Sequence, residues 1–322
     1  MKAMLVGDVH LADRPPSVRV DTYKQDILDK LDWIVTKTNE SDAECLVLLG
    51  DVFHIKRPDR NSHKLVQETS EVLTQCNVPV RIVPGNHDVM QDSMESLPSQ
   101  PLGTLALHPS ISLVSGPDPD FPMFGVPYFD PNMENFEYWV EQYRKEQGPD
   151  KYQFIIAHQA IFPKKEEPIY DYVSAERWAT EFEAKWTAYG HIHSRMKAGA
   201  FYKIPHPDGQ VSWFCNNGAI SRGSLHEETI NRKLAVTMFD SENEKTQFVS
   251  IPIPYKPAKE VFNMETVEFQ EQRDAMVDSF LTSLGGMEFD QLTLEGILAK
   301  STSLPAGARK HLSDIMEEVT SA

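Results

Sequence analysis

The sequence has few cysteines and no long apolar run. Three of its 322 residues are cysteine, and Cys45, Cys76 and Cys215 show no CxxC spacing. Neither a disulfide framework nor a thiolate metal site is therefore indicated. No stretch approaches the roughly 18 consecutive apolar residues of a membrane span, and Met1–Val6 lacks the features of a signal peptide. We expect a soluble globular protein with a cytoplasmic location and no membrane partner.

Basic residues are too few to balance the acidic ones. The chain has 31 Lys and Arg against 48 Asp and Glu, which gives a formal net charge of −17. Such a charge repels a polyanion over about a Debye length and argues against tight, autonomous binding of nucleic acid. A phosphate substrate must therefore be attracted locally, by metal ions or by a partner.

What the sequence does contain is an alternation of short apolar runs and amphipathic segments. Five runs are expected to be buried strands: Ala3–Val6, Cys45–Leu49, Val80–Val83, Met123–Val126 and Phe154–Ala157. Helical spacing of apolar residues marks Tyr23–Lys37, Ser62–Cys76 and Asn135–Gln147. Later strands at Ser212–Cys215, Lys233–Phe239 and Gln247–Ile253 suggest a second sheet. The sequence predicts an α/β fold built on a two-sheet sandwich, with polar loops at the carboxyl ends of the strands.

Prolines divide the chain. Three of them in residues 251–257 remove backbone donors and fix φ, which excludes regular helix or a central strand. We expect a core at residues 1–255, a linker at 256–267 and a helical segment at 268–322. Acidic residues outnumber basic ones in the last segment, which suits packing or partner binding better than DNA contact.

Five motifs rich in histidine and aspartate occur in order, most of them where a predicted strand ends. They are Gly7-Asp8-Val9-His10, Gly50-Asp51-Val52-Phe53-His54, Gly85-Asn86-His87-Asp88, Ala157-His158-Gln159 and Gly190-His191-Ile192-His193. One such motif alone is more often a turn than a metal site, but five at strand ends predict a shared site. The expected metal ligands are Asp8, His10, Asp51, Asn86, His158, His191 and His193.

The residue types and their spacing favour two divalent ions. Asp8 and His10 are one residue apart, so on an extended segment both side chains point to the same side and can chelate one ion. The Asp51 carboxylate can bridge two ions. Oxygen and nitrogen ligands without thiolate suit Mn, Fe or Zn rather than Ca. We expect two Mn²⁺ ions, with Fe²⁺ or Zn²⁺ as alternatives, that support phosphoester hydrolysis.

The third motif also offers catalytic groups. His87 is left free to protonate the leaving oxygen or steady the transition state, and Asp88 is expected to orient its imidazole.

Basic residues next to the motifs have two interpretations that both stay open: a positive rim that guides phosphates, or ordinary loop charge. These residues are Lys56, Arg57, Arg60, Lys64, Lys164, Lys165, Arg195, Lys197 and Lys203.

The ordered motifs resemble those of the calcineurin-like metallophosphoesterase superfamily over about residues 1–255. The resemblance implies a four-layer αββα sandwich with a dimetal centre. It implies that one ion is held by Asp8, His10, Asp51 and His193, and that the other is held by Asp51, Asn86, His158 and His191.

Within the superfamily, the second motif followed by Pro58 is similar to that of the SbcD-type DNA repair exonucleases. This resemblance implies Mn-dependent 3′→5′ exonuclease and single-strand endonuclease activity on DNA. It places His54 beside the metals, where it positions the DNA strand, and implies an SbcC-like coiled-coil ATPase as partner. Residues 216–222 depart from the proline-glycine-serine turn that these nucleases often have.

Two alternatives stay open beside the nuclease. One is a small-molecule or nucleotide phosphodiesterase or pyrophosphatase that uses the same ions. The second is a scaffold subunit that recruits the ATPase through residues 268–322. The oligomeric state, with a homodimer as one option, also stays open.

Overall fold

The computed structural model of the chain describes residues 1–266, apart from 92, 131–132, 147–151, 165–170, 195–199, 224–229, 231 and 244–246. By internal contacts the chain divides into two compact units, Met1–Val261 and Phe262–Ala322. The features analysed below lie in the first unit. The helical segment expected at 268–322 lies outside the described residues, so the three-part division stays a prediction.

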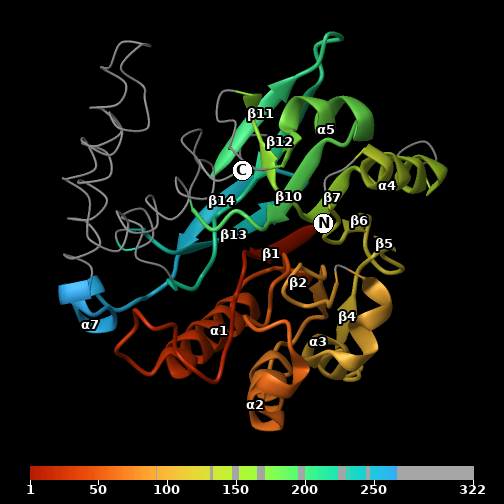
Figure 1. Cartoon of the computed structure of the whole chain (residues 1–322). Coiled ribbons are helices and arrows are strands. Elements are labelled where there is room, and N and C mark those ends of the chain that lie inside the picture. Colours follow the sequence, from red (N-terminus) through yellow and green to blue (C-terminus); the bar gives the residue numbers. More distant parts are fainter. Residues whose placement is uncertain are drawn as a thin grey trace, which may run out of the picture. The chain divides into compact units, whose positions relative to one another are not determined.

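Two six-stranded sheets form the centre of the first unit (Figure 1). The first has the order β14-β13-β1-β2-β3-β4, in which β1 to β4 are parallel and β13 and β14 are antiparallel additions. Its strands are β1 (Lys2–Val6), β2 (Cys45–Leu48), β3 (Val80–Ile82), β4 (Ile111–Leu113), β13 (Ala235–Asp240) and β14 (Phe248–Pro252).

The second sheet has the order β11-β12-β10-β7-β6-β5, with a parallel centre and an antiparallel strand at each edge. Its strands are β5 (Gly116–Pro117), β6 (Met123–Val126), β7 (Phe154–His158), β10 (Trp186–Gly190), β11 (Phe201–Pro205) and β12 (Val211–Cys215). A separate parallel pair consists of β8 (Ile161–Phe162) and β9 (Val173–Ser174).

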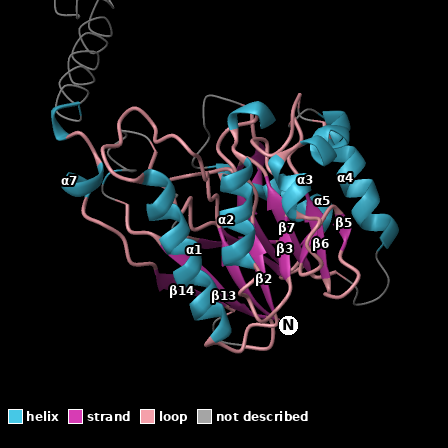
Figure 2. Ribbon diagram, turned by 90° about the horizontal axis from the view of Figure 1, so that it is seen from below, coloured by secondary structure: helices cyan, strands magenta, loops and turns pink. Residues whose placement is uncertain are grey.

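Helices cover the outer face of each sheet (Figure 2). The first sheet packs against α1 (Tyr23–Asn39), α2 (His63–Leu73) and α3 (Pro101–Leu105), and the second packs against α4 (Met133–Glu146) and α5 (Ala175–Phe182). Shorter helices are η1 (Pro58–Arg60), η2 (Met94–Ser99) and α7 (Ala258–Val261). The α/β class and the four-layer αββα sandwich implied by the resemblance are therefore confirmed.

Local sequence explains where two of these helices begin. The side chain of Ser62 accepts a hydrogen bond from the Leu65 amide at 3.0 Å, and Ser174 does the same for the Arg177 amide at 3.1 Å. Each serine thereby satisfies one of the amides that a helix leaves unpaired in its first turn. None of the helices in the described part of the chain has the length and apolarity needed to cross a membrane.

The expected strands occur, but four of them lie in a different sheet from the one expected. Strands β6 and β7 lie in the second sheet, and the late strands β13 and β14 return to the first, where β13 pairs with β1. An apolar run reports burial on both faces and does not identify the neighbouring strand. Pro252 is tolerated because β14 is an edge strand, where a missing amide donor leaves no ladder partner unpaired.

Aromatic residues fill the layer between the sheets. Phe239 of β13 stacks on Phe154 of β7 with ring centroids 4.3 Å apart, and it meets the edge of Trp186 of β10 at 5.4 Å. Phe239 and Phe154 are fully buried and belong to one apolar cluster with strands from both sheets. This layer holds the two sheets face to face and fixes the relative position of their carboxyl ends.

Replacing Phe239 by alanine should lower the free energy of unfolding by about 3–5 kcal/mol, because a large ring is lost and a cavity remains. Val249→Ala on β14 is the matched control, since Val249 is 46% exposed and its loss should cost under about 0.5 kcal/mol. Urea denaturation followed by circular dichroism measures both. Equal stability of the two variants would show that this layer does not hold the sheets.

Candidate metal centre

The five motifs meet where parallel strands from both sheets end. Each motif either completes its strand or follows it within a few residues, so the polar side chains gather at one edge of the sandwich. Asp8 and His10 follow β1, Asp51 follows β2, Asn86 and His87 follow β3, His158 ends β7, and His191 and His193 follow β10.

Two groups of ligand atoms gather here, and the second of them in chain order lies between β2, β3, β7 and β10. Nε2 of His158 is 3.2 Å from Oδ1 of Asn86 and 3.4 Å from Oδ2 of Asp51. Nδ1 of His191 is 3.1 Å from the same Asn86 oxygen and 3.3 Å from His158 Nε2. These four side chains are the set that the family resemblance implied for one ion.

The first group lies on the other side of Asp51. Nε2 of His10 is 2.7 Å from Nε2 of His193 and 3.7 Å from Oδ2 of Asp51. Ligand atoms of Asp8, His10, Asp51 and His193 all lie within 4.8 Å of one another, close enough to hold a metal ion. The structure thus brings all seven expected ligands into two adjacent groups that share Asp51.

Two buried carboxylate oxygens test whether cations fit here. Oδ1 of Asp8 accepts the His191 amide at 2.9 Å, and Oδ1 of Asp51 accepts the His87 amide at 2.7 Å. Oδ2 of each aspartate is buried and has no hydrogen-bond partner among the described residues. Because an unpaired buried anion is costly, divalent ions suit these positions.

Hydrogen bonding and nearby charges determine the protonation of the buried histidines. His158 donates from Nδ1 to the Leu49 carbonyl at 2.7 Å, which leaves Nε2 as its ligand atom. Burial lowers the pKa of His158, but the charges of Asp51 and Asp8 outweigh burial and raise that pKa to about 9. Burial, followed by the charge of His158, lowers the pKa of His191 to about 3. The two aspartates therefore attract positive charge to this point.

The backbone at the cluster is held in an uncommon conformation. His10, Asp51 and His191 have φ values of 54°, 47° and 84°, and Gly50 has 97°. Left-handed conformations cost free energy in residues other than glycine and persist where surrounding contacts enforce them. Here the His10 amide donates to the Asp51 carbonyl at 2.8 Å, so the turns after β1 and β2 support each other.

His54 and His87 lie at the edge of the first group. Nδ1 of His87 donates to the His54 carbonyl at 2.5 Å, so Nε2 is the ring atom left for chemistry. The two rings stack with centroids 5.4 Å apart, and the His87 ring is 5.0 Å from that of His10. Both side chains are half-buried, which keeps them accessible to a substrate.

Asp88 has a different place from the one expected. Its buried carboxylate accepts the backbone amides of Val52 at 3.1 Å and Gly85 at 3.0 Å. Burial and the neighbouring Asp51 raise the pKa of Asp88 to about 7. The His54 carbonyl orients His87, in place of the Asp88 carboxylate that the sequence indicated, because Asp88 is directed at the turn that carries Asp51.

Residues 216–222 brace the cluster. The Asn216 amide group donates to the Tyr189 carbonyl at 2.9 Å and its oxygen accepts the Gly218 amide at 2.8 Å. The Ile220 amide then donates to the Asp8 carbonyl at 2.9 Å. This segment ties β12 to the motifs after β1 and β10.

Sequence reasoning missed two side chains near the cluster. Tyr128 follows β6, and its ring centroid is 5.4 Å from that of His191. Its position directly after a predicted strand could have identified Tyr128 from the sequence. Arg232 lines a cavity with His10, His54 and His193, and no motif marks it.

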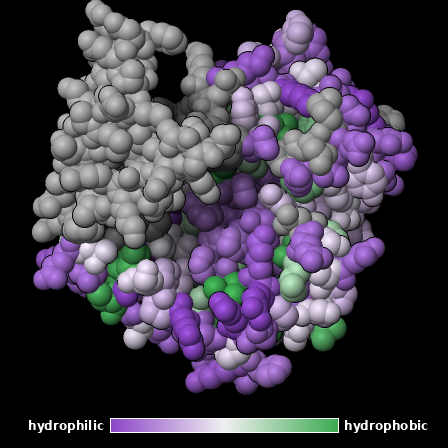
Figure 3. Space-filling view, in the orientation of Figure 1, coloured by the Kyte–Doolittle hydropathy of each residue, from purple (hydrophilic) through white to green (hydrophobic). Residues whose placement is uncertain are grey.

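That cavity, of about 220 Å³, adjoins the first ligand group and is also lined by Tyr23, Ser221 and Gly223. Figure 3 shows that hydrophilic side chains predominate around a hollow on the face turned to the viewer.

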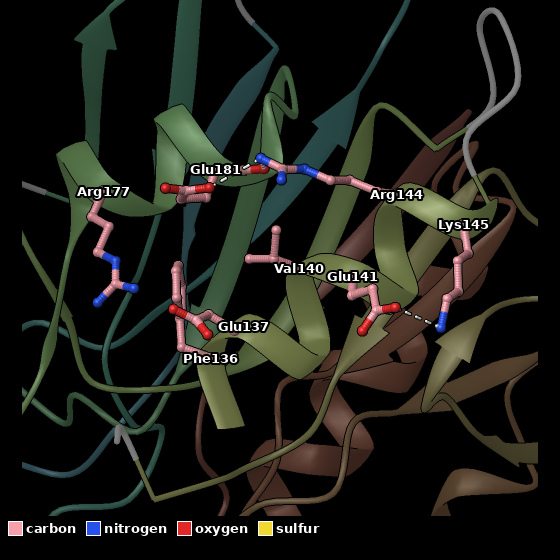
Figure 4. Close-up of a pocket in the computed structure, with 8 residues that line it drawn as sticks. All are labelled: Phe136, Glu137, Val140, Glu141, Arg144, Lys145, Arg177 and Glu181. Carbon is pink, nitrogen blue, oxygen red and sulfur yellow. Dashed lines mark hydrogen bonds and ion pairs between the residues drawn. The ribbon is translucent and has the colours of Figure 1, made fainter. Parts of the chain in front are cut away.

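A separate groove between α4 and α5 is drawn in Figure 4. Four of its charged residues pair with each other, Arg144 with Glu181 at 3.0 Å and Lys145 with Glu141 at 3.0 Å. The groups of side chains able to hold a metal ion among the described residues lie at the strand ends and not in this groove, so we place the active site there.

The sandwich and the cluster of carboxylates and imidazoles define a metal-dependent hydrolase. The family model described as calcineurin-like phosphoesterase matches residues 1–195, and the chain belongs to this family. Members of the family use two divalent ions, in agreement with the two ligand groups.

Curated relatives include two proteins named DNA double-strand break repair protein Mre11. The one from Methanocaldococcus jannaschii is 23% identical over 208 residues, which cover 58% of this chain and 51% of the relative. The one from Archaeoglobus fulgidus is 33% identical over 93 residues, 27% of this chain and 19% of the relative. The matched segments thus span about half or less of these relatives. The similarity agrees with the likeness to DNA repair proteins seen in the motifs.

A solved structure of a dimetal phosphatase from Danio rerio shares the fold. It superposes with a TM-score of 0.50 at 15% identity, over 80% of this chain and 97% of that chain. At this identity the likeness concerns the fold alone.

Gly50→Ala should weaken metal binding. A Cβ at Gly50 would overlap the His158 imidazole, in addition to the strain of a φ of 97°. Gly209→Ala is the matched control, because Gly209 has a φ of 87° but nothing near its Cβ position. Both variants should lose about 1 kcal/mol of stability or more. Only Gly50→Ala should lose Mn²⁺ affinity, by about tenfold to 100-fold in titration calorimetry. Unchanged affinity would mean that His158 is not a ligand.

Proposed function

We propose that the protein hydrolyses phosphodiester bonds in DNA as a Mn²⁺-dependent exonuclease or endonuclease that acts in DNA repair or recombination. The observation that carries the proposal is the position of His54. It lies beside the first ligand group, with Nδ1 3.3 Å from Nδ1 of His10, yet it is outside both four-residue ligand sets. A half-buried histidine at that place can contact a strand whose phosphate lies at the ions. The similarity to the two double-strand break repair proteins supports the same reading.

The residues have distinct roles in this proposal. Asp8, His10, Asp51 and His193 would hold one ion, and Asp51, Asn86, His158 and His191 would hold the other. Two bound divalent ions supply Lewis acidity and activate water at neutral pH. His87 donates from Nδ1 to the His54 carbonyl and, in its imidazolium form, would give the Nε2 proton to the leaving oxygen. Asp88 keeps the Asp51 turn in place through its backbone hydrogen bonds.

The expected basic rim receives limited support. Arg57 pairs with Asp59 at 2.8 Å and Lys64 pairs with Glu68 at 3.5 Å, so acidic neighbours offset both charges. Lys165, Arg195 and Lys197 lie outside the described residues. For Arg57 and Lys64, ordinary loop charge is the better interpretation, and the metal ions carry most of the attraction for phosphate.

A second candidate is a small-molecule or nucleotide phosphodiesterase. The specific observation in its favour is the small cavity of about 220 Å³ beside the cluster, together with the net charge of −17, which disfavours a polyanion. Activity on nucleotide diesters with intact DNA would select this candidate.

An SbcC-like coiled-coil ATPase partner and a homodimer belong to the nuclease proposal. Residues 268–322, which are the segment expected to recruit the ATPase, lie outside the described residues.

Asp51→Ala and His87→Gln should separate metal binding from proton transfer. Asp51→Ala removes the carboxylate shared by both ligand groups and should abolish Mn²⁺ binding and hydrolysis together. His87→Gln should keep the Mn²⁺ content and lower kcat about 10²–10⁴-fold, because the proton donor is lost. His108→Gln, an exposed histidine away from the cluster, is the control and should retain full activity. Equal metal loss in the Asp51 and His87 variants would contradict these roles.

Loss of His54 should affect the hydrolysis of DNA more than the hydrolysis of a small ester. With Mn²⁺, the wild type should release nucleotides from end-labelled duplex DNA and also hydrolyse bis-(4-nitrophenyl) phosphate. In His54→Ala, DNA hydrolysis should fall about tenfold or more relative to ester hydrolysis, because only the long substrate needs positioning. Labelling the 3′ and 5′ ends in parallel gives the polarity. Ester hydrolysis by the wild type with DNA left intact would refute the nuclease.

A further inference from the structure

We propose that the guanidinium of Arg232 binds a non-bridging oxygen of the substrate phosphate in the cavity beside the metal centre. The inference deepens the proposed function at the same site. It requires only that the protein binds a phosphate group there, whether the substrate is DNA or a small ester.

The hydrogen bonding of Arg232 is incomplete on one edge. Its side chain is buried, with 6% of the residue exposed, and Nη2 donates to the carbonyls of Ala219 at 2.7 Å and Ser221 at 2.5 Å. Nε and Nη1 are buried and have no hydrogen-bond partner among the described residues. Leaving charged donors unpaired in the interior is costly, so a ligand that accepts from them is expected.

The location of Arg232 identifies the ligand. Arg232 lines the cavity of about 220 Å³ together with His10, His54 and His193. Nη1 lies close to Gly218, whose neighbour Ala219 donates its amide to the His193 carbonyl at 3.2 Å. Arg232 therefore lies next to the first ligand group, where a phosphate oxygen would meet both an ion and the arginine.

The charge of Arg232 suits an oxyanion. Burial lowers its pKa to about 10, and the nearby Asp8 works against that decrease, so the group is cationic at neutral pH. The arginines that pair with a carboxylate in the described part of the chain are Arg19, Arg57, Arg81 and Arg144, and Arg232 is not among them. A guanidinium presents two parallel donors to a phosphate, and an ammonium cannot match this geometry.

Arg222 provides a useful contrast. It is also buried, but its Nη1 and Nη2 donate to the carbonyls of Ile230 and Lys256, and its guanidinium lies 4.8 Å from the centre of the Tyr255 ring. Arg222 does not line the cavity of the metal centre. Of these two arginines, Arg232 is the one that lines the cavity.

Arg232→Lys tests the proposal, with Arg81→Lys as the matched control. Arg81 is also buried, but it pairs with Asp118 at 2.7 Å and does not line the cavity. The Mn²⁺-loaded full chain is assayed for hydrolysis of bis-(4-nitrophenyl) phosphate and for inhibition by inorganic phosphate, and Mn²⁺ content is measured. In Arg232→Lys, KM and the inhibition constant of phosphate should each rise about tenfold or more, with Mn²⁺ retained. Arg81→Lys should leave both constants unchanged.

Several outcomes would overturn the proposal. Unchanged phosphate inhibition in Arg232→Lys would mean that the ions alone bind the phosphate, and loss of Mn²⁺ at intact fold would make Arg232 a support of the metal site. If Arg232→Lys fails to fold, Arg232→Gln, which keeps a donor to the Ala219 and Ser221 carbonyls, replaces it with the same criteria. Direct calorimetry of phosphate binding to the Mn²⁺-loaded protein gives the answer even if no ester or DNA is hydrolysed. The inference and the proposed nuclease can thus fail separately.

Discussion

The structure depends most on two carboxylates that are buried at the junction of the sheets. Asp8 and Asp51 each satisfy one oxygen with a backbone amide, and each leaves the other oxygen buried without a partner. Such groups destabilise a fold unless positive charge reaches them. The surrounding imidazoles, the raised pKa of His158 and the nearby Arg232 all follow from that need. Two divalent ions meet it most directly, and the hydrolytic chemistry of the family is the result.

The backbone is arranged to bring these groups together, at a cost in conformational strain. Three of the seven expected ligands have a left-handed backbone, and the chain enforces it through hydrogen bonds between turns of different strands. Glycine at position 50 lets the β2 turn approach the His158 ring closely. Strain of this kind is stable only where packing is rigid. The aromatic layer around Phe239 provides that rigidity, since it sets the two sheets against each other.

Much of this arrangement could be predicted from the sequence, because apolar runs mark buried strands and the motifs follow them. Five early strands (β1, β2, β3, β6 and β7), the three long helices and the convergence of Asp8, Asp51 and His158 needed no structure. The pairing of β13 with β1 could not be predicted, since it joins segments more than 200 residues apart and apolar runs carry no information on partners. Asp88 was given the wrong contact because adjacency in sequence suggested His87, whereas the side chain turns back to the Asp51 loop. Arg232 has no motif at all, and only its burial and unpaired donors reveal it.

The distribution of the ligands over both sheets has a mechanical consequence. Asp8, His10, Asp51 and Asn86 come from the first sheet, and His158, His191 and His193 come from the second. Any ion bound by both sets is a cross-link between the two halves of the sandwich. The three cysteines are free, so no covalent bond does this in the described part of the chain. Ion binding therefore adds to the stability of the fold by mass action, and chelation would loosen the sandwich at the edge where catalysis occurs.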